Sequence, residues 1–249
     1  MYSSRRRSVW GRMASPSARR VLFVGNSLTF WQEGGLDGLF REWGLDAAAE
    51  TAPGVTLVRL WKMGKAYQRI QEGGWDVVVL QDDMPEYRSD PRRERWRAVH
   101  EQSTAAVAKF VEAIRAIGAT PVIFMSHEYA RLAHTSIDDI CAAHKVMENV
   151  LDVAIAPAGL AHRLAAAQLD QLAESCPLLD PDEEHPSIAG RFLNAATIAA
   201  TVFGTDSLSG ICLHGGGASD RIDDTVLELL RAVAVEVGSK WAAMPVPSE

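Results

Sequence analysis

The sequence predicts an α/β fold of three layers, in which helices cover both faces of a mostly parallel, doubly wound sheet of five strands. Short apolar runs typical of buried strands alternate along the 249-residue chain with longer stretches that have helical periodicity. Right-handed crossovers between parallel strands then place helices on both faces of the sheet.

Five apolar segments are expected to form the strands. The clearest is the third, where Val77-Val78-Val79-Leu80 contains no polar side chain. Such continuous runs are typical of strands that are buried on both faces of a parallel sheet. The expected strands are Val21–Val24, Ala47–Thr51, Asp76–Gln81, Pro121–Met125 and Asp152–Ala156.

Helices are expected where apolar residues recur at helical intervals. The long third helix stops at Gly118, and glycine commonly ends helices. The expected helices are Leu36–Trp43, Leu57–Ile70, Arg95–Ile117, Ile137–Leu151, Ile188–Phe203 and Thr225–Val237.

The candidate residues for an active site follow the expected strands. Ser27, Gly54, Gln81 and His127 come after the first four strands, and the segment 182–185 lies beyond the fifth. In open α/β sheets, ligands bind at the carboxyl ends of the strands. These residues are therefore expected to meet at one edge of the sheet.

Ser27, Asp182 and His185 have the residue types of a nucleophilic hydrolase site. A serine hydroxyl is a weak nucleophile at neutral pH, so it needs a base within hydrogen-bond reach and a third group that orients this base. His185 is expected to take the proton of Ser27, and Asp182 to fix the imidazole tautomer. Asp180 is an alternative orienting acid. Another interpretation is that these residues only cap helices.

These residues stand in two blocks that resemble the SGNH (GDSL-like) hydrolase family. The blocks are GNSLT at 25–29 and DEEHPS at 182–187, with Gly54 between them, and the resemblance covers roughly residues 20–205. It implies that the first block supplies the nucleophile and that the second supplies the acid and the base. It also implies a flavodoxin-like arrangement of the sheet, and an ester hydrolase that works without a cofactor.

An acyl transfer also needs hydrogen-bond donors for the developing oxyanion. The candidates are the backbone N–H of Ser27, the backbone at Gly54 and the side-chain amide of Gln81. The family usually has Gly-x-Asn-Asp after the third strand, whereas this chain has LQDD at 80–83. Gln81 keeps an amide but is one methylene longer. The alternatives are that water fills this role or that activity is reduced.

Three side chains near the same edge are expected to contact substrate, namely Trp31, Asp82 and His127. Trp31 can stack on a sugar, although core packing is an alternative. Asp82 can instead belong to a solvated acidic rim, and His127 can be a residue at a strand end. His127-Glu128 also begins like a zinc-protease motif, but Arg131 stands where the second histidine belongs, so no metal is expected.

The charge pattern argues against nucleic acid as a partner. The net charge is −7, and residues 1–20 hold six arginines and no acid, which leaves −13 for the rest.

Residues 1–19 are expected to be a basic, disordered tail, and residues 20–249 a single SGNH-like domain. No apolar run is long enough for a membrane span, and the three cysteines are widely spaced, so a cytoplasmic protein is expected. The oligomeric state is open.

The leading hypothesis is a serine esterase that acts on a small-molecule ester, for example as a deacetylase of carbohydrate or lipid esters. A catalytically silent binding module with the same fold is an alternative, motivated by Gln81. An acyltransferase that uses the same three residues is another, because hydrolysis and transfer share the acyl-enzyme.

Overall fold

The computed structural model describes residues 19–31, 34–82, 93–131, 136–171, 176–210 and 222–246. The side chains of residues 93–100 and 209–210 are not among the described parts. The expected basic tail at 1–19 therefore lies almost wholly outside the described residues.

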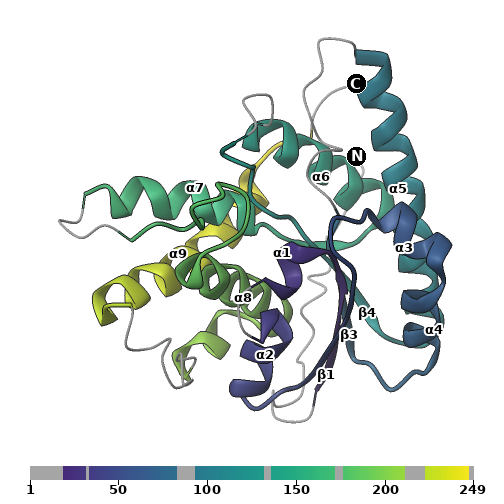
Figure 1. Ribbon diagram of the computed structural model, residues 1–249, viewed down its shortest axis with the longest axis horizontal. Coiled ribbons are helices and arrows are strands. Elements are labelled where there is room, and N and C mark those ends of the chain that lie inside the picture. The colour runs from purple at the N-terminus through teal and green to yellow at the C-terminus, as the bar shows by residue number, and fades with distance from the viewer. Residues whose placement is uncertain are drawn as a thin grey trace, which may run out of the picture.

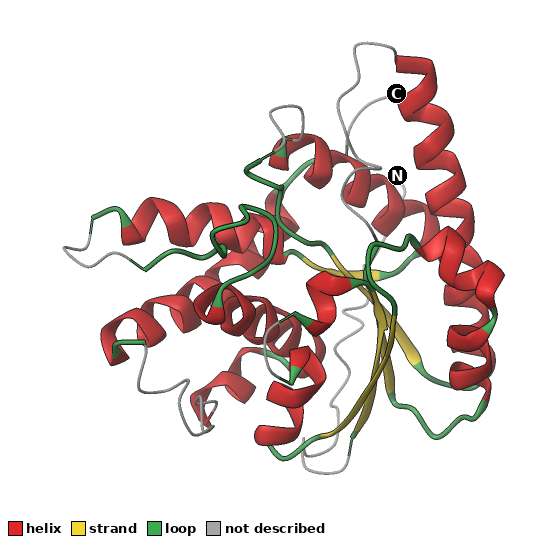
Figure 2. Ribbon diagram, viewed as in Figure 1, coloured by secondary structure: helices red, strands yellow, loops and turns green. Residues whose placement is uncertain are grey.

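A parallel sheet of five strands forms the centre of the fold, in the order β2-β1-β3-β4-β5. Helices lie on both of its faces (Figure 1; Figure 2), so the expected three-layer α/β fold is confirmed. Each predicted strand is found within two residues of its expected bounds. The strands are β1 (Arg20–Gly25), β2 (Asp46–Thr51), β3 (Val77–Leu80), β4 (Thr120–Phe124) and β5 (Ala154–Ala156).

The direction of each crossover decides which face its helix covers. The chain moves from β1 outward to β2, then back across β1 and on through β3 and β4 to β5. Right-handed connections in opposite directions place their helices on opposite faces. One face carries α2 (Gly35–Glu42), α7 (Ala158–Leu169), α8 (Ile188–Phe203) and α9 (Asp224–Ala243); the other carries α3 (Leu57–Met63), α4 (Lys65–Gln71), α5 (Arg93–Ala116) and α6 (Ile137–Leu151).

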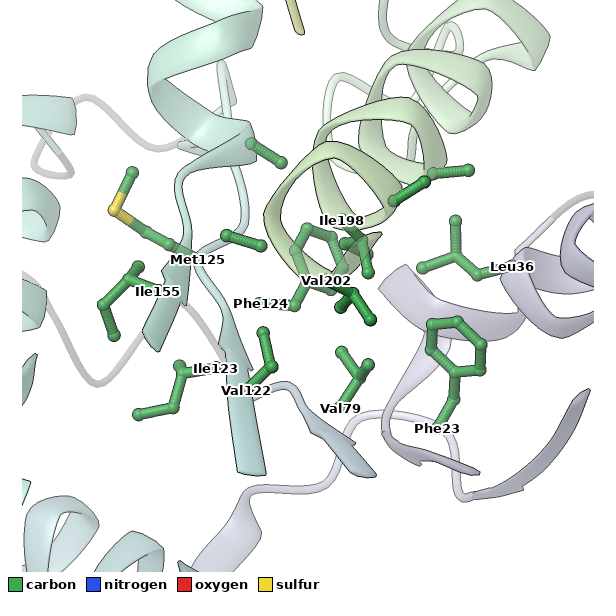
Figure 3. Close-up of a cluster of buried hydrophobic side chains, with 14 of the residues drawn as sticks. Phe23, Leu36, Val79, Val122, Ile123, Phe124, Met125, Ile155, Ile198 and Val202 are labelled. Carbon is green, nitrogen blue, oxygen red and sulfur yellow. The ribbon is translucent and has the colours of Figure 1, made fainter. Parts of the chain in front are cut away.

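The core lies between the sheet and these helices. Phe23, Val79 and Val122 are paired across the three central strands, and each is at most 2% exposed. Figure 3 shows this row facing Ile198 and Val202 of α8. Burial of apolar side chains on both faces explains why β1, β3 and β4 appear in the sequence as continuous apolar runs.

Three helix predictions were incomplete. The last expected helix ends at Val237, whereas α9 continues to Ala243. The expected helix 57–70 is two helices, because Gly64 has φ +79° and ends α3 in the left-handed conformation that glycine adopts without a Cβ clash. Helix α7 was not predicted, since its apolar residues have weak helical periodicity. Its sequence AGLAHRLAAAQL is rich in alanine, the strongest helix former, and that signal could have identified it.

Candidate active site

Ser27 lies at the carboxyl end of β1, as the sequence predicts. It is the first residue of α1 (Ser27–Phe30). Ser27 is buried, with 9% of its surface exposed. Asn26 caps this short helix, because its Oδ1 accepts a hydrogen bond from the N–H of Leu28 at 3.0 Å. The turn directly after the strand therefore fixes the backbone of Ser27.

The segment 178–187 forms a closed loop between α7 and α8. Its two sides pair at the Leu179–Pro186 bridge, and the N–H of Asp180 donates to the carbonyl of His185 at 2.8 Å. Ser187 then caps α8, where Gly190 is required because a Cβ there would lie 2.0 Å from the Leu178 carbonyl. The helix start thus anchors the loop that carries the acid and the histidine.

The fold brings the three residues of the predicted site together. The Nε2 atom of His185 lies 2.8 Å from Oγ of Ser27, and its Nδ1 lies 2.7 Å from Oδ2 of Asp182. These are hydrogen-bond distances. Asp182, and not the alternative Asp180, is the carboxylate that faces the imidazole.

Asp182 is held as a carboxylate by the loop around it. Its Oδ1 accepts backbone hydrogen bonds from Glu184 at 3.0 Å and His185 at 2.9 Å. Partial burial acts to raise the pKa of Asp182, but these bonds and the bond from the His185 ring outweigh it and lower the pKa to about 2. Glu183, the residue directly after Asp182, adopts φ +59°, which lets the chain turn tightly enough for both N–H groups to point at one oxygen.

Gly54 and Gln81, which the sequence predicts as oxyanion donors besides Ser27, differ in their exposure to solvent. Gly54 is exposed in the turn after β2, with φ +59° and open space where a Cβ would stand. Gln81 is 1% exposed, and its Oε1 accepts the N–H of Asn26 at 2.8 Å. That bond fixes the direction of the amide, so Nε2 donates to the carbonyl of Asp82. One of its two amide hydrogens is thereby used, and a donor role for Gln81 stays a prediction.

Asn26 is a residue that sequence reasoning missed. Besides capping α1, it donates from Nδ2 to the carbonyl of Val55 at 3.3 Å, and it is 1% exposed. It therefore joins the turn of Ser27 to the turn of Gly54. Asparagine is a favoured helix cap, and this was the available sequence signal.

Two of the expected substrate contacts have partners inside the protein. Asp82 is 4% exposed; its Oδ1 accepts the N–H of Leu57, and its Oδ2 accepts the hydroxyl of Ser103. Trp31 stacks on the ring of His185 and donates its indole N–H to Asp180. Substrate contact by either residue remains a prediction.

His127 contacts and supports the segment 178–187, which we call the acid–base loop. Its Nε2 lies 2.8 Å from the carbonyl of Glu184, so Nε2 carries the proton and donates it. Burial disfavours the charged ring and lowers the pKa of His127 to about 4. Its ring stacks on His162, and Arg131 forms an ion pair with the Glu184 carboxylate. Contact of His127 with substrate likewise stays a prediction.

Within the described ranges, no cluster of three or more histidine, cysteine, aspartate or glutamate side chains is arranged to hold a metal ion. Over the same residues, no helix combines the length and the apolar character needed to cross a bilayer.

No model of a known protein family matches the sequence, and neither does any curated protein. Solved structures do match. Axe2, an acetylxylan esterase from Geobacillus stearothermophilus, is similar with a TM-score of 0.54 at 16% identity over 76% of this chain and 97% of its own. LAE5, an α/β hydrolase from the metagenome of Lake Arreo, gives a TM-score of 0.54 at 12% identity over 75% and 95%. TesA gives 0.50 at 15% identity over 78% and 100%.

This chain has the SGNH hydrolase fold. The resemblance that the two sequence blocks indicate is thus confirmed at the level of structure. In Axe2, catalytic mutants have been made at a serine, at a histidine and at an aspartate three positions before that histidine. Asp182 and His185 have the same spacing in this chain.

Proposed function

We propose that this SGNH-fold protein is a serine hydrolase that cleaves carboxylic esters of small molecules. The observation that carries the proposal is the continuous hydrogen-bonded series from Ser27 Oγ through the His185 ring to Asp182, with distances of 2.8 and 2.7 Å. Serine, histidine and aspartate in this arrangement form the machinery of acyl transfer on several unrelated folds.

The reaction follows from these contacts. His185 takes the proton of Ser27 as Oγ attacks the ester carbonyl, and it then gives this proton to the leaving alcohol. Water attacks the resulting acyl-serine with His185 again acting as base, and the products are a carboxylic acid and free enzyme. Asp182 holds the imidazole in the tautomer whose Nε2 can accept, because its carboxylate accepts the Nδ1 proton.

The oxyanion of the tetrahedral intermediate needs donors next to Ser27. We assign this role to the backbone N–H groups of Ser27 and Gly54, with Asn26 linking the two turns. The start of a short helix at Ser27 also favours developing negative charge. Gln81 holds the N–H of Asn26 and keeps one amide hydrogen for a third contact.

The similarity to Axe2 favours a small acyl group, because that enzyme is an acetyl-xylooligosaccharide esterase. We therefore expect turnover of acetyl esters before longer acyl chains. This mechanism uses no cofactor, since each proton moves between His185 and either Ser27, the leaving alcohol or the attacking water.

Labelling with a fluorophosphonate probe tests the proposal directly. The probe should modify Ser27 in the full-length protein, and Ser27→Ala should lose both labelling and hydrolysis of p-nitrophenyl acetate. Ser239→Ala is a matched control, because Ser239 is exposed on α9. It should leave both properties unchanged.

The possible outcomes separate the alternatives. Hydrolysis that persists in Ser27→Ala would reject Ser27 as the nucleophile. A folded protein that is never labelled would favour the catalytically silent binding module. Product formed on an added acceptor alcohol, at the expense of free acid, would favour the acyltransferase.

A further inference from the structure

Trp31 is fixed to the turn that carries the nucleophile. It is the first residue after α1, and its backbone N–H donates to the carbonyl of Ser27 at 2.7 Å. This last hydrogen bond of the helix holds the backbone of Trp31 next to Ser27.

The indole of Trp31 makes two contacts with the acid–base loop. Its ring stacks on the ring of His185, with 3.6 Å between centroids and 14° between planes. Its Nε1–H donates to Oδ2 of Asp180 at 2.7 Å. Asp180 in turn donates its backbone N–H to the carbonyl of His185 and accepts the N–H of Glu183 at 2.9 Å. Trp31 thus contacts both His185, the proposed base, and Asp180, whose backbone closes the acid–base loop.

We propose that Trp31 and Asp180 form a positioning pair that holds the His185 ring between Ser27 and Asp182. The inference rests on the proposed function, because it assigns a role within the same site. It differs from the sequence prediction of Trp31 as a substrate contact, since His185 covers one face of the indole.

The pair has an electrostatic effect as well as a geometric one. His185 becomes an imidazolium when it takes the proton of Ser27, and the face of an indole attracts a cation. The carboxylate of Asp180 accepts the indole N–H and makes the ring face more negative. The stacking contact is consequently stronger in the transition state than in the resting enzyme, which is the condition for raising kcat.

Three single variants and one double variant separate the role of the indole ring from that of its hydrogen bond. Trp31→Leu removes the aromatic face and should lower kcat roughly 10-fold with little change in KM, the size of a partly buried cation–π contact. Trp31→Phe keeps a ring face and loses the N–H, so it should lower kcat only a few-fold. Asp180→Ala removes the acceptor and should match Trp31→Phe, and the double variant Trp31→Phe with Asp180→Ala should add little, because both changes break the same hydrogen bond.

The measurements are kcat and KM for a p-nitrophenyl ester, and the rate of fluorophosphonate labelling at Ser27. Trp61→Phe is the control, since Trp61 packs against Tyr67 and Phe110 and not against the acid–base loop. It should change neither rate, and thermal unfolding of each variant reports whether the fold is retained.

The results that would overturn the proposal are distinct. A rise in KM with unchanged kcat in Trp31→Leu would make Trp31 a substrate contact. Equal labelling rates in the wild-type protein and Trp31→Leu, or additive effects in the double variant, would overturn the positioning pair alone. A wild-type protein that is not labelled at all would overturn this proposal together with the proposed function.

Discussion

The side of the proposed site that carries Ser27 (the nucleophile side) is built into the buried ends of strands, whereas the side that carries Asp182 and His185 (the acid–base side) is a loop that reaches the surface. Asn26 and Gln81 are each 1% exposed and hydrogen-bonded to each other. The side chain of Asp182 is 43% exposed, and that of His185 is 13% exposed. The nucleophile side is held by the sheet itself, and the acid–base side is held by side chains that pack against its loop.

The difference shows how each half keeps its geometry. On the nucleophile side, the sheet sets the backbone and buried amides link three neighbouring turns. On the acid–base side, side chains from two other segments hold the loop: Trp31 stacks on His185, and His127 and Arg131 contact Glu184. Substitutions on the first side should disturb both folding and activity, whereas those on the second should affect activity more than stability.

The largest effect is expected at Asp182. In Asp182→Asn the amide can donate to Nδ1 and so favours the tautomer in which Nε2 carries the proton and cannot act as base. We expect kcat to fall roughly 10⁴-fold. Because the pKa of Asp182 is about 2, its carboxylate is ionised in the enzyme above about pH 4, so the substitution removes a negative charge at every pH at which the assay is run, from pH 6 to 9.

Glu183→Gln is the matched control for that substitution. It removes the neighbouring charge from the same loop, and Glu183 is exposed. Steady-state kinetics should find it close to the wild-type protein. A similar loss in both variants would mean that the loop acts through its charge and not through the tautomer of His185.

The next largest effect is expected at Asn26, on the buried side. Asn26→Asp keeps an oxygen to cap α1 but replaces the N–H donor to Val55 with an oxygen that repels the carbonyl. The turn of Gly54 should shift, and the loss of one oxyanion donor lowers kcat by roughly 10²- to 10³-fold. The melting temperature should fall as well, because the site is buried.

Asp223→Asn provides a control for the capping chemistry. Asp223 caps α9 through the N–H of Thr225, far from Ser27 in the sequence, and asparagine is an equally good cap. Activity should not change. If Asn26→Asp also keeps full kcat, the link between the two turns has no part in the oxyanion site.

The sequence predicted the parts of this site whose signals are local. Continuous apolar runs predicted β3 and β4. The GNSLT and DEEHPS blocks pointed to Ser27, Asp182 and His185, whose side chains the fold brings within hydrogen-bond distance of one another. Contacts across the fold could not be predicted in this way. The direction of the Gln81 amide depends on Gly25, where a Cβ would lie 2.6 Å from Oε1 of Gln81. The stacking of Trp31 on His185 joins residues from distant segments, and periodicity carries no information about it.

The smallest effect is expected at His127, and it appears in stability. Unfolded, this histidine takes up a proton near pH 6.5, but the pKa of about 4 keeps the buried ring neutral in the folded protein. The unfolded state therefore binds more protons between these values, and stability falls as the pH drops through that window.

His127→Gln keeps an N–H that can reach the carbonyl of Glu184 and removes the titration. Between pH 8 and pH 5, the variant should lose roughly 2 kcal/mol less stability than the wild-type protein in urea unfolding. His162 remains buried beside it with a lowered pKa, so some acid sensitivity should persist. Parallel losses in the two proteins would mean that His127 is solvated, and the acid–base loop would then lack the buried support that distinguishes it from an ordinary surface turn.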